Sequence, residues 1–194
     1  MSQRIEIITE NADIYFYVRP FTQLAVCGYF DCGIPEYNDY LFQDALRSMD
    51  DHVAFTWLLI ERDTGKTAAF ISLIMDAIKL SFTEKERHHL NYPFRTIPAM
   101  KIAKLAVDSG FSGKYKGIGT FMIVSAKRFA WDCNSKYCAA RFLTVDADIE
   151  HDKLKGISLS AGVIAFYEKN GFIPNAELSN KNRKTISMRR DLYS

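Results

Sequence analysis

An apolar stretch followed by two closely spaced glycines limits the possible folds of this chain more than any other feature. Residues 102–107 read Ile-Ala-Lys-Leu-Ala-Val, which predicts a buried strand, and a glycine-containing loop then leads to Gly117 and Gly119. From Gly117 to Trp131 the apolar residues recur at helical spacing. Glycines at a helix start let a ligand approach free backbone N–H groups, where the helix dipole favours phosphate. The segment therefore predicts a strand, a phosphate-binding loop and a helix.

The two common nucleotide-binding motifs do not fit this loop. A Walker loop requires Gly-x4-Gly-Lys-Ser/Thr, which the chain lacks. A dinucleotide fingerprint requires a third glycine at the position that Met122 occupies. Lys114 and Lys116 add positive charge beside the glycines. Taken alone, the glycine pair leaves two readings open, a phosphate site and a tight turn between strand and helix.

The other segments predict a mixed sheet in a single domain, residues 1–194. Asp63-Thr64-Gly65 between two β-rich runs predicts a hairpin, and Ser81 with Glu84 has the form of a capping box. The remaining strands are expected at 14–18, 53–61, 67–75, 141–145, from 172 and at 185–192, the remaining helices at 35–47, 81–89 and 163–169, and loops at 108–116 and 146–162. We expect an α/β (α+β) fold with a partly antiparallel central sheet and helices on both faces, because the hairpins exclude a doubly wound parallel sheet.

Composition and charge exclude several classes of protein. The formal net charge of +2 does not by itself argue for nucleic-acid binding. No segment has the length and hydropathy of a membrane span, and the first residues do not have the pattern of a secretion signal, so we expect a cytoplasmic protein. The four cysteines form two Cys-x4-Cys pairs without histidines at ligand spacing. We therefore expect free, inert thiols and no metal.

A second motif gives the glycine loop a more specific meaning. Lys114-Tyr115-Lys116-Gly117-Ile118-Gly119 resembles the Gln/Arg-x-x-Gly-x-Gly/Ala loop that binds acetyl-CoA in the GNAT superfamily of N-acetyltransferases, with lysine at the first position. Residues 162–172, Gly-Val-Ile-Ala-Phe-Tyr-Glu-Lys-Asn-Gly-Phe, resemble the A-x-x-F-Y-x-x-x-G-F segment of the same superfamily. The resemblance covers residues 102–172 well and the first hundred loosely.

The resemblance implies a fold and a set of roles. It implies that the fourth and fifth strands of the family sheet splay apart and that the pantetheine of acetyl-CoA, the co-substrate, lies between them. Tyr167 would be the general acid that protonates the leaving thiolate, and an amine would attack the thioester directly. The backbone N–H of Val107 would stabilise the developing oxyanion. The implied cofactor-binding residues are Leu105, Ala106, Val107, Lys114, Tyr115, Lys116, Gly117, Ile118, Gly119, Thr120 and Phe166.

A softer resemblance concerns the acceptor amine. Residues 30–35, Phe-Asp-Cys-Gly-Ile-Pro, and residues 97–108, Ile-Pro-Ala-Met-Lys-Ile-Ala-Lys-Leu-Ala-Val-Asp, are similar to segments of the GNAT toxins of toxin–antitoxin pairs. That similarity implies aminoacyl-tRNA as acceptor and an antitoxin as partner. The chain departs from that group at Lys104, where arginine is usual, and in the length of residues 146–162. A small-molecule or peptide amine, a non-catalytic acyl-CoA-binding or partner-binding role, and a homodimer are left open.

The sequence offers several weak candidates for further site residues. The candidates for a general base are Asp108, Asp146, Asp148, Glu150 and His151, although the resemblance also implies water in that role, as in many members of the superfamily. Five basic residues near the C-terminus either contact an RNA backbone or form a solvated hairpin: Lys181, Arg183, Lys184, Arg189 and Arg190.

Overall fold

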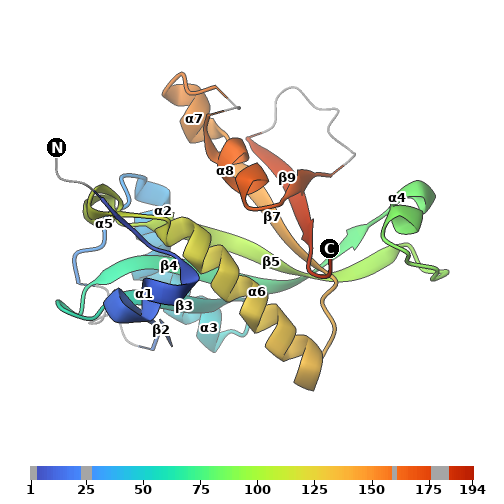
Figure 1. Cartoon of the computed structure of the whole chain (residues 1–194), viewed down its shortest axis with the longest axis horizontal. Helices are drawn as coiled ribbons and strands as arrows, with labels where there is room; N and C mark the ends of the chain where they lie inside the picture. The colour runs from blue at the N-terminus through green and yellow to red at the C-terminus, as the bar shows by residue number, and fades with distance from the viewer. Residues whose placement is uncertain (1–3, 23–27, 159–160, 176–183) are drawn as a thin grey trace. The chain divides into compact units, whose positions relative to one another are not determined.

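The computed structural model describes residues 4–22, 28–158, 161–175 and 184–194 and contains two compact units (Figure 1). The first unit consists of Met1–Ile74 and Ile102–Arg128, and the second of Met75–Lys101 and Phe129–Ser194. Among the described residues, no helix is both long enough and apolar enough to cross a membrane. The single domain expected from the sequence stays a prediction.

The strands form one large sheet and one small parallel pair. The seven-stranded sheet has the order β2-β3-β4-β5-β7-β9-β8, and β1 pairs with β6. The bounds are β1 Ile5–Glu6, β2 Phe16–Pro20, β3 Phe55–Glu61, β4 Thr67–Lys79, β5 Thr96–Val107, β6 Tyr115–Lys116, β7 Phe142–Asp148, β8 Ile173–Pro174 and β9 Thr185–Asp191. The pairs β2–β3, β3–β4, β7–β9 and β8–β9 are antiparallel. The expected partly antiparallel sheet is confirmed.

The helices are mostly short, with one long exception. Their bounds are α1 Thr9–Tyr15, α2 Pro35–Asp39, η2 Tyr40–Asp44, α3 Ala45–Asp50, α4 Phe82–Arg87, α5 Ser109–Lys114, α6 Ile118–Lys136, α7 Glu150–Leu154 and α8 Val163–Lys169. The elements α2, η2 and α3 follow one another without a break, as a π-helical turn joins two α-helical pieces. The helix expected at 35–47 is therefore confirmed.

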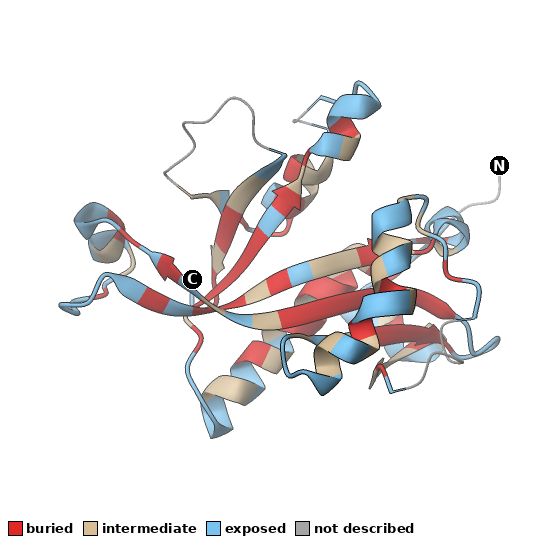
Figure 2. Ribbon diagram, turned by 180° about the vertical axis from the view of Figure 1, so that it is seen from behind, coloured by how far each residue is buried: buried red, intermediate tan, exposed pale blue. Residues whose placement is uncertain are grey.

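In the first unit, helices cover both faces of the strands. The first turns of α6 lie on one face and the α2–α3 segment lies on the other (Figures 1 and 2). Side chains alternate along a strand, so Leu58 and Ile60 of β3 share one face and Glu61 belongs to the other. Leu58 and Ile60 pack with Leu41 and Ala45 in a buried cluster. The opposite orientation of Glu61 places its carboxylate near the glycine loop.

Several local predictions are confirmed. The hairpin joins β3 to β4, with Gly65 at φ +68°. The capping box forms in α4, where the Ser81 hydroxyl accepts the Glu84 N–H and the Glu84 carboxylate accepts the Ser81 N–H. Helix α8 spans Val163–Lys169 as expected, and Gly171 follows it at φ +78°.

Three predicted segments were wrong in part. The strand expected at 14–18 begins only at Phe16, because the Asn11 side chain accepts the Ile8 N–H and donates to the Glu6 carbonyl, which starts α1. The loop expected at 108–116 contains α5 and β6, since Asp108 caps the helix. The connection expected at 146–162 is shorter, because β7 continues to Asp148 against β9 and α7 follows.

Candidate acetyl-CoA site

The glycine loop ends at the first turn of α6, where backbone donors are exposed by the geometry of a helix start. The hydrogen-bond ladder of α6 begins with the Phe121 N–H, which donates to the Gly117 carbonyl at 2.9 Å. The N–H groups of Ile118, Gly119 and Thr120 precede that first bond, and a helix supplies no partner for such groups. This turn therefore offers a cluster of N–H donors at the positive end of the helix dipole.

Gly117 is required by the fold of the loop itself. Its φ is +95°, which side chains rarely tolerate, and a Cβ there would overlap the Ile7 carbonyl oxygen. That carbonyl is fixed because β1 pairs with β6 and the Ile7 N–H donates to the Lys116 carbonyl at 2.7 Å. The tight turn alone therefore explains why this position is glycine, independently of a ligand.

A buried carboxylate anchors the residues that lead into the loop. Glu61, at the end of β3, is 3% exposed. Its Oε1 accepts the Lys114 ammonium at 2.8 Å and the Tyr115 hydroxyl at 2.7 Å, and its Oε2 accepts the Thr64 hydroxyl at 2.7 Å. Three donors on one buried carboxylate hold the loop to the β3–β4 hairpin.

The charges of this anchor support one another. Burial raises the pKa of the Glu61 carboxyl, but the hydrogen bonds from Lys114, Thr64 and Tyr115 together bring that pKa below its ordinary value. The hydrogen bond to Glu61 is the main cause that raises the pKa of the Lys114 ammonium. Glu61 is therefore ionised and Lys114 charged at neutral pH.

The two lysines of the loop both have carboxylate partners. Lys114 pairs with Glu61, and Lys116 lies 3.4 Å from Glu6, where both side chains are exposed. The positive charge that the sequence placed beside the glycines is thus largely balanced by protein carboxylates. The phosphate-binding capacity of the loop rests on its backbone N–H groups, and the predicted phosphate contact of the Lys114 side chain stays a prediction.

The end of β5 combines a buried residue with a helix cap. Ala106 is buried, whereas Leu105 and Val107 are partly exposed. The next residue, Asp108, donates its N–H to the Ala68 carbonyl at 2.9 Å. Its carboxylate accepts the N–H groups of residues 110 and 111 and, at 2.8 Å, that of residue 31. These contacts make Asp108 a structural cap, which argues against its role as the general base.

Lys104 lies against two aromatic rings of the α2–η2 segment. Its ammonium lies 4.6 Å from the ring centroid of Tyr37 and 5.8 Å from that of Tyr40. Both are cation–π distances. The α2–η2 segment that carries these tyrosines also packs against Phe70, whose ring stacks on Tyr40 at 6.1 Å. The lysine that replaces the usual arginine thus has a defined position of its own.

Tyr167 lies in α8 among aromatic rings. It is 5% exposed, with the rings of Phe166 and Phe172 at centroid distances of 5.1 and 5.3 Å. A buried tyrosine packed in this way keeps a fixed ring orientation. That is compatible both with a core residue and with a general acid, and the assigned role stays a prediction.

A buried aspartate fixes the start of the helix that carries Tyr167. Asp152 of α7 is 8% exposed, and its Oδ2 accepts the Val163 N–H at 2.6 Å. A Cβ on Gly162 would overlap the same carboxylate. The aspartate therefore acts as the N-terminal cap of α8, and the glycine before the helix makes room for it.

The remaining base candidates mostly have other partners. Asp146 pairs with Lys101 at 2.5 Å, and Asp148 accepts the Glu150 N–H at 3.0 Å. Glu150 pairs with Lys184 at 2.9 Å. His151 is half-buried. The carboxylates of this segment thus have partners in the local structure, and the choice between them and water as acceptor of the amine proton stays a prediction.

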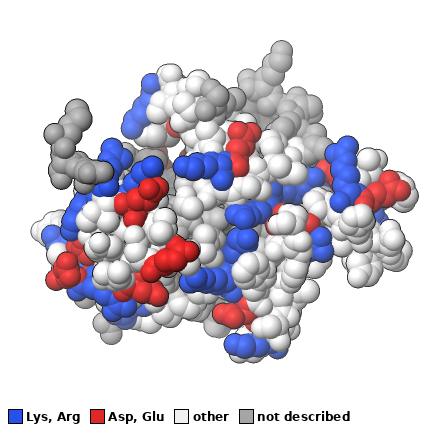
Figure 3. All heavy atoms as spheres, in the orientation of Figure 1, with Lys and Arg blue, Asp and Glu red and all other residues white. Residues whose placement is uncertain are grey.

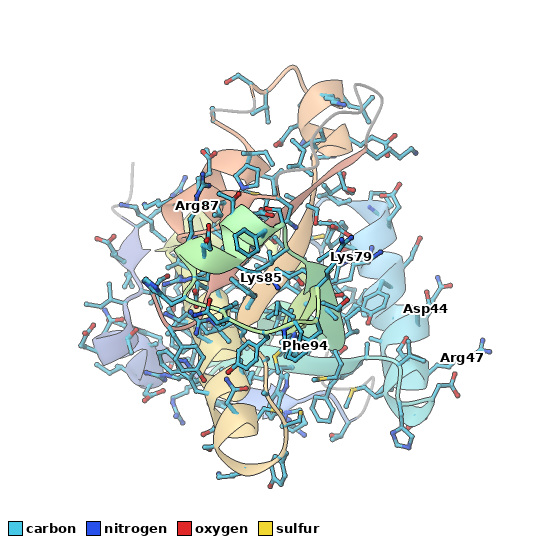
Figure 4. The ribbon with its side chains drawn as sticks, turned by 90° about the vertical axis from the view of Figure 1, so that its right-hand side faces the viewer. Asp44, Arg47, Lys79, Lys85, Arg87 and Phe94 are labelled. Atoms are coloured by element: carbon cyan, nitrogen blue, oxygen red, sulfur yellow. The ribbon has the colours of Figure 1, made fainter. Side chains whose placement is uncertain are left out.

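The second unit contains a cleft of about 910 Å³ with a positive lining. Lys79, Lys85 and Arg95 are among its lining residues, and Lys79, Lys85 and Phe94 lie on the same side of the molecule (Figure 4). Among the described residues, the lining consists of Ala77, Ile78, Lys79, Leu80, Ser81, Phe82, Glu84, Lys85, Pro93, Arg95, Asn175, Ser187 and Arg189. The rings of Tyr92 and Phe94 stack at 5.3 Å, and both are exposed. Cations beside exposed aromatic rings are typical of surfaces that bind nucleic acid.

Three of the five basic residues near the C-terminus lie within the described residues, and each of the three contacts a group of the protein itself. Arg189 is 5% exposed and donates to Glu84 at 2.8 Å and to Asn175 at 2.7 Å. Arg190 donates to the Asn170 carbonyl, and Lys184 pairs with Glu150. Lys181 and Arg183 lie outside the described residues. On the face drawn in Figure 3, lysines and arginines are interspersed with carboxylates.

Two residues that organise these segments were not found from the sequence. Glu61 reads as the last residue of a strand, and only the three-dimensional pairing of β3 reveals its contact with the loop. Asp152 reads as one of several carboxylates in a polar connection. A capping aspartate eleven residues before the helix that it caps has no local signature.

Solved structures similar to this chain have the GNAT fold and come from toxin–antitoxin systems. A tyrosine-to-phenylalanine mutant of KacT is 20% identical over 90% of this chain and 95% of its own, with a TM-score of 0.68. AtaT complexed with acetyl-methionyl-tRNAfMet is 18% identical over 92% and 95%, with a TM-score of 0.68. A mutant AtaT toxin bound to the C-terminus of the antitoxin AtaR and acetyl-CoA is 17% identical over 92% and 94%, with a TM-score of 0.65.

The chain therefore has the GNAT fold, as its two motifs predicted. Comparison with protein-family models gives no match, and neither does comparison with curated protein sequences. The similarity at 17 to 20% identity concerns the fold.

Proposed function

We propose that this chain is an acetyl-CoA-dependent N-acetyltransferase that transfers the acetyl group to a primary amine. The first turn of α6 carries this proposal. It presents the N–H groups of Ile118, Gly119 and Thr120 at the end of a loop that Gly117 and Glu61 hold in place. Such a turn suits the pyrophosphate of acetyl-CoA. A structural neighbour, the AtaT mutant, was solved with acetyl-CoA.

The other site residues take the roles that the family motifs assign to them. Tyr115 to Thr120 hold the pyrophosphate, and the backbone of Leu105, Ala106 and Val107 pairs with pantetheine as an added strand would. Phe166 packs near the pantetheine, and the Val107 N–H stabilises the oxyanion that forms when the amine attacks the thioester.

Tyr167 completes the reaction as general acid. The neutral amine attacks the thioester carbon, the tetrahedral species collapses, and the C–S bond breaks. The Tyr167 hydroxyl protonates the departing thiolate, while water takes the proton of the amine. Acetyl-CoA is a co-substrate here, and this chemistry requires no metal.

We further propose aminoacyl-tRNA as the acceptor. The AtaT structure with acetyl-methionyl-tRNAfMet supports this, because that toxin shares the fold of this chain. The positive cleft of the second unit supports it independently. The positive charge of the cleft comes from Lys79, Lys85 and Arg95. Surfaces for the stacking of bases come from Tyr92 and Phe94, the sequence neighbours of the lining residue Pro93.

The acceptor is tested by mixing the protein with acetyl-CoA and a panel of amines. The panel contains aminoacyl-tRNA, free amino acids, polyamines and peptides, and the readouts are free CoA thiol and mass spectrometry of the acceptor. Acetylated aminoacyl-tRNA is expected. Turnover only with a small amine or a peptide would replace this acceptor, and acetyl-CoA binding without turnover would indicate a non-catalytic member.

A charge-removing variant tests the cleft separately. Lys79→Gln should weaken tRNA use and reduce its salt dependence, while free amino-acid derivatives are used as before. Arg47→Gln is the matched control, because Arg47 is an exposed arginine of α3 that pairs with Asp51 and is not among the residues of the cleft. Equal effects of the two substitutions would remove the cleft from the proposal.

An antitoxin is the partner that fits a toxin of this fold, as the AtaT–AtaR structure illustrates for AtaT. Overexpression of the chain in a bacterial host should then arrest growth, and a small reading frame next to the gene should relieve the arrest. Growth that overexpression leaves unchanged would overturn the toxin role. A homodimer stays a prediction, to be measured by light scattering.

A further inference from the structure

Two cysteine thiols lie together at the C-terminal end of α6. The Sγ atoms of Cys133 and Cys138 are 3.2 Å apart, and both cysteines are free. The contact is as close as a hydrogen bond between thiols, and a modest further approach would bring the two sulfurs to bonding distance. The sequence alone suggested inert thiols here, and the close pair is a different arrangement.

The chain around the thiols is held by groups other than the sulfurs. The Cys133 carbonyl accepts the N–H groups of Tyr137 at 2.8 Å and Cys138 at 3.1 Å. The Asn134 side chain accepts the Ala140 N–H, donates to the Ala140 carbonyl at 2.8 Å and donates to the Tyr193 hydroxyl at 2.6 Å. This frame brings the cysteines together before any bond forms between them.

The pair is also accessible to a reagent. Cys138 is exposed and Cys133 is partly exposed. Cys32 provides a contrast in the same chain. Its thiol is partly exposed, like that of Cys133, but it lies 3.2 Å from the Asn38 amide oxygen and not beside a second thiol. Burial raises the pKa of Cys32, and the contact with Cys133 raises the pKa of Cys138, so the contrast rests on position. An oxidant in solution should therefore reach Cys138 first, and the thiol beside Cys138 is that of Cys133.

We propose that Cys133 and Cys138 form a redox-active dithiol that small-molecule disulfides convert to an intramolecular disulfide. The Cys138 thiolate attacks one sulfur of the small disulfide, which forms a mixed disulfide and releases one thiol. The Cys133 thiolate then attacks the Cys138 sulfur and releases the second thiol, with both protein protons lost. The protein pair loses two electrons, and the small disulfide gains them. The product joins the last turns of α6 to the segment before β7.

The test is a titration of the full chain with oxidised and reduced glutathione. Samples are quenched with acid, alkylated and mapped by mass spectrometry. The wild type should lose the mass of two hydrogen atoms and yield a linked Cys133–Cys138 peptide, while Cys32 remains alkylated. Because both thiols are already in contact, the closed form should exceed the glutathione adduct about tenfold or more. Cys138→Ser should give at most a glutathione adduct on Cys133.

Two results would overturn the proposal. One is a stable glutathione adduct on wild-type Cys138 without closure, and the other is alkylation of both thiols at every glutathione ratio. Asn134→Ala tests the frame, because the loosened segment should lower the closed fraction several-fold at the same ratio. If that variant does not fold, Tyr193→Phe removes one contact of Asn134 and should give a smaller decrease. An unchanged closed fraction in the folded frame variant would contradict the pre-positioning.

Discussion

The glycine loop and helix α8 carry the two motifs of this chain, and helices α6 and α8 each follow a glycine whose Cβ position is occupied by an oxygen. At Gly117 the oxygen is the Ile7 carbonyl, which belongs to a paired backbone segment. At Gly162 it is the carboxylate of Asp152, the far end of a side chain. The Ile7 carbonyl cannot move away from an added Cβ unless the β1–β6 pair is disrupted. The Asp152 carboxylate can move away by rotation of its side chain. Two glycines of similar appearance in a motif thus differ in how strictly the fold requires them.

The largest expected effect separates chemistry from packing in α8. Tyr167→Phe removes only the hydroxyl of a ring that packs between Phe166 and Phe172. Loss of a general acid should lower kcat about 100-fold or more, while the free energy of unfolding changes by less than about 1 kcal/mol. Acetyl-CoA turnover and urea denaturation measure the two quantities. Unchanged turnover across the pH range would show that Tyr167 is only a core residue.

The next effect concerns the strict glycine. Gly117→Ala forces a side chain into a φ of +95° and against the Ile7 carbonyl, so we expect a loss of about 2–4 kcal/mol in unfolding free energy and weaker acetyl-CoA binding. Gly113→Ala is the matched control, because this α5 glycine has nothing within 4 Å of the added Cβ. Its effect should be near zero or slightly stabilising. Equal unfolding free energies of the two variants would contradict a strict requirement for glycine at position 117.

The Glu61 anchor should give the loop a dependence on pH. Glu61→Gln should lower the unfolding free energy at pH 7 by about 2 kcal/mol, because charged hydrogen bonds are lost. The folded pKa of Glu61 lies below its ordinary value of 4.5, so this stabilisation is complete above that value and is lost as pH falls through the folded pKa. The difference between wild type and variant should therefore shrink in acid. A constant difference from pH 7 to pH 3 would contradict the assignment.

The smallest effect concerns the glycine that faces a movable side chain. Gly162→Ala should cost about 1 kcal/mol, as it displaces the Asp152 carboxylate from the Val163 N–H. Asp152→Ala loses the same cap. The double variant should lose less unfolding free energy than the two single variants together, because the methyl group added at position 162 no longer meets a carboxylate. Strictly additive losses of unfolding free energy would mean that the two residues act separately.

Sequence patterns located the elements of the site better than the contacts that hold them. The periodicity of apolar residues and the spacing of glycines predicted β5, α6 and α8, because each of these elements depends on residues close together in the chain. The charge of Arg189 suggested a surface residue, yet pairing with Glu84, 105 positions away in sequence, buries it. Glu61 and Lys114 are 53 positions apart and meet only in the folded sheet. Such pairings depend on topology and leave no local pattern.

The most direct test of the account is a calorimetric titration of acetyl-CoA into the wild type and into Gly119→Glu. The substitution places a carboxylate among the N–H donors at the start of α6, where a pyrophosphate would lie. We expect the wild type to bind acetyl-CoA with a Kd on the order of micromolar and the variant to lose the binding heat. No binding by the wild type, or equal binding by both proteins, would contradict the proposed site.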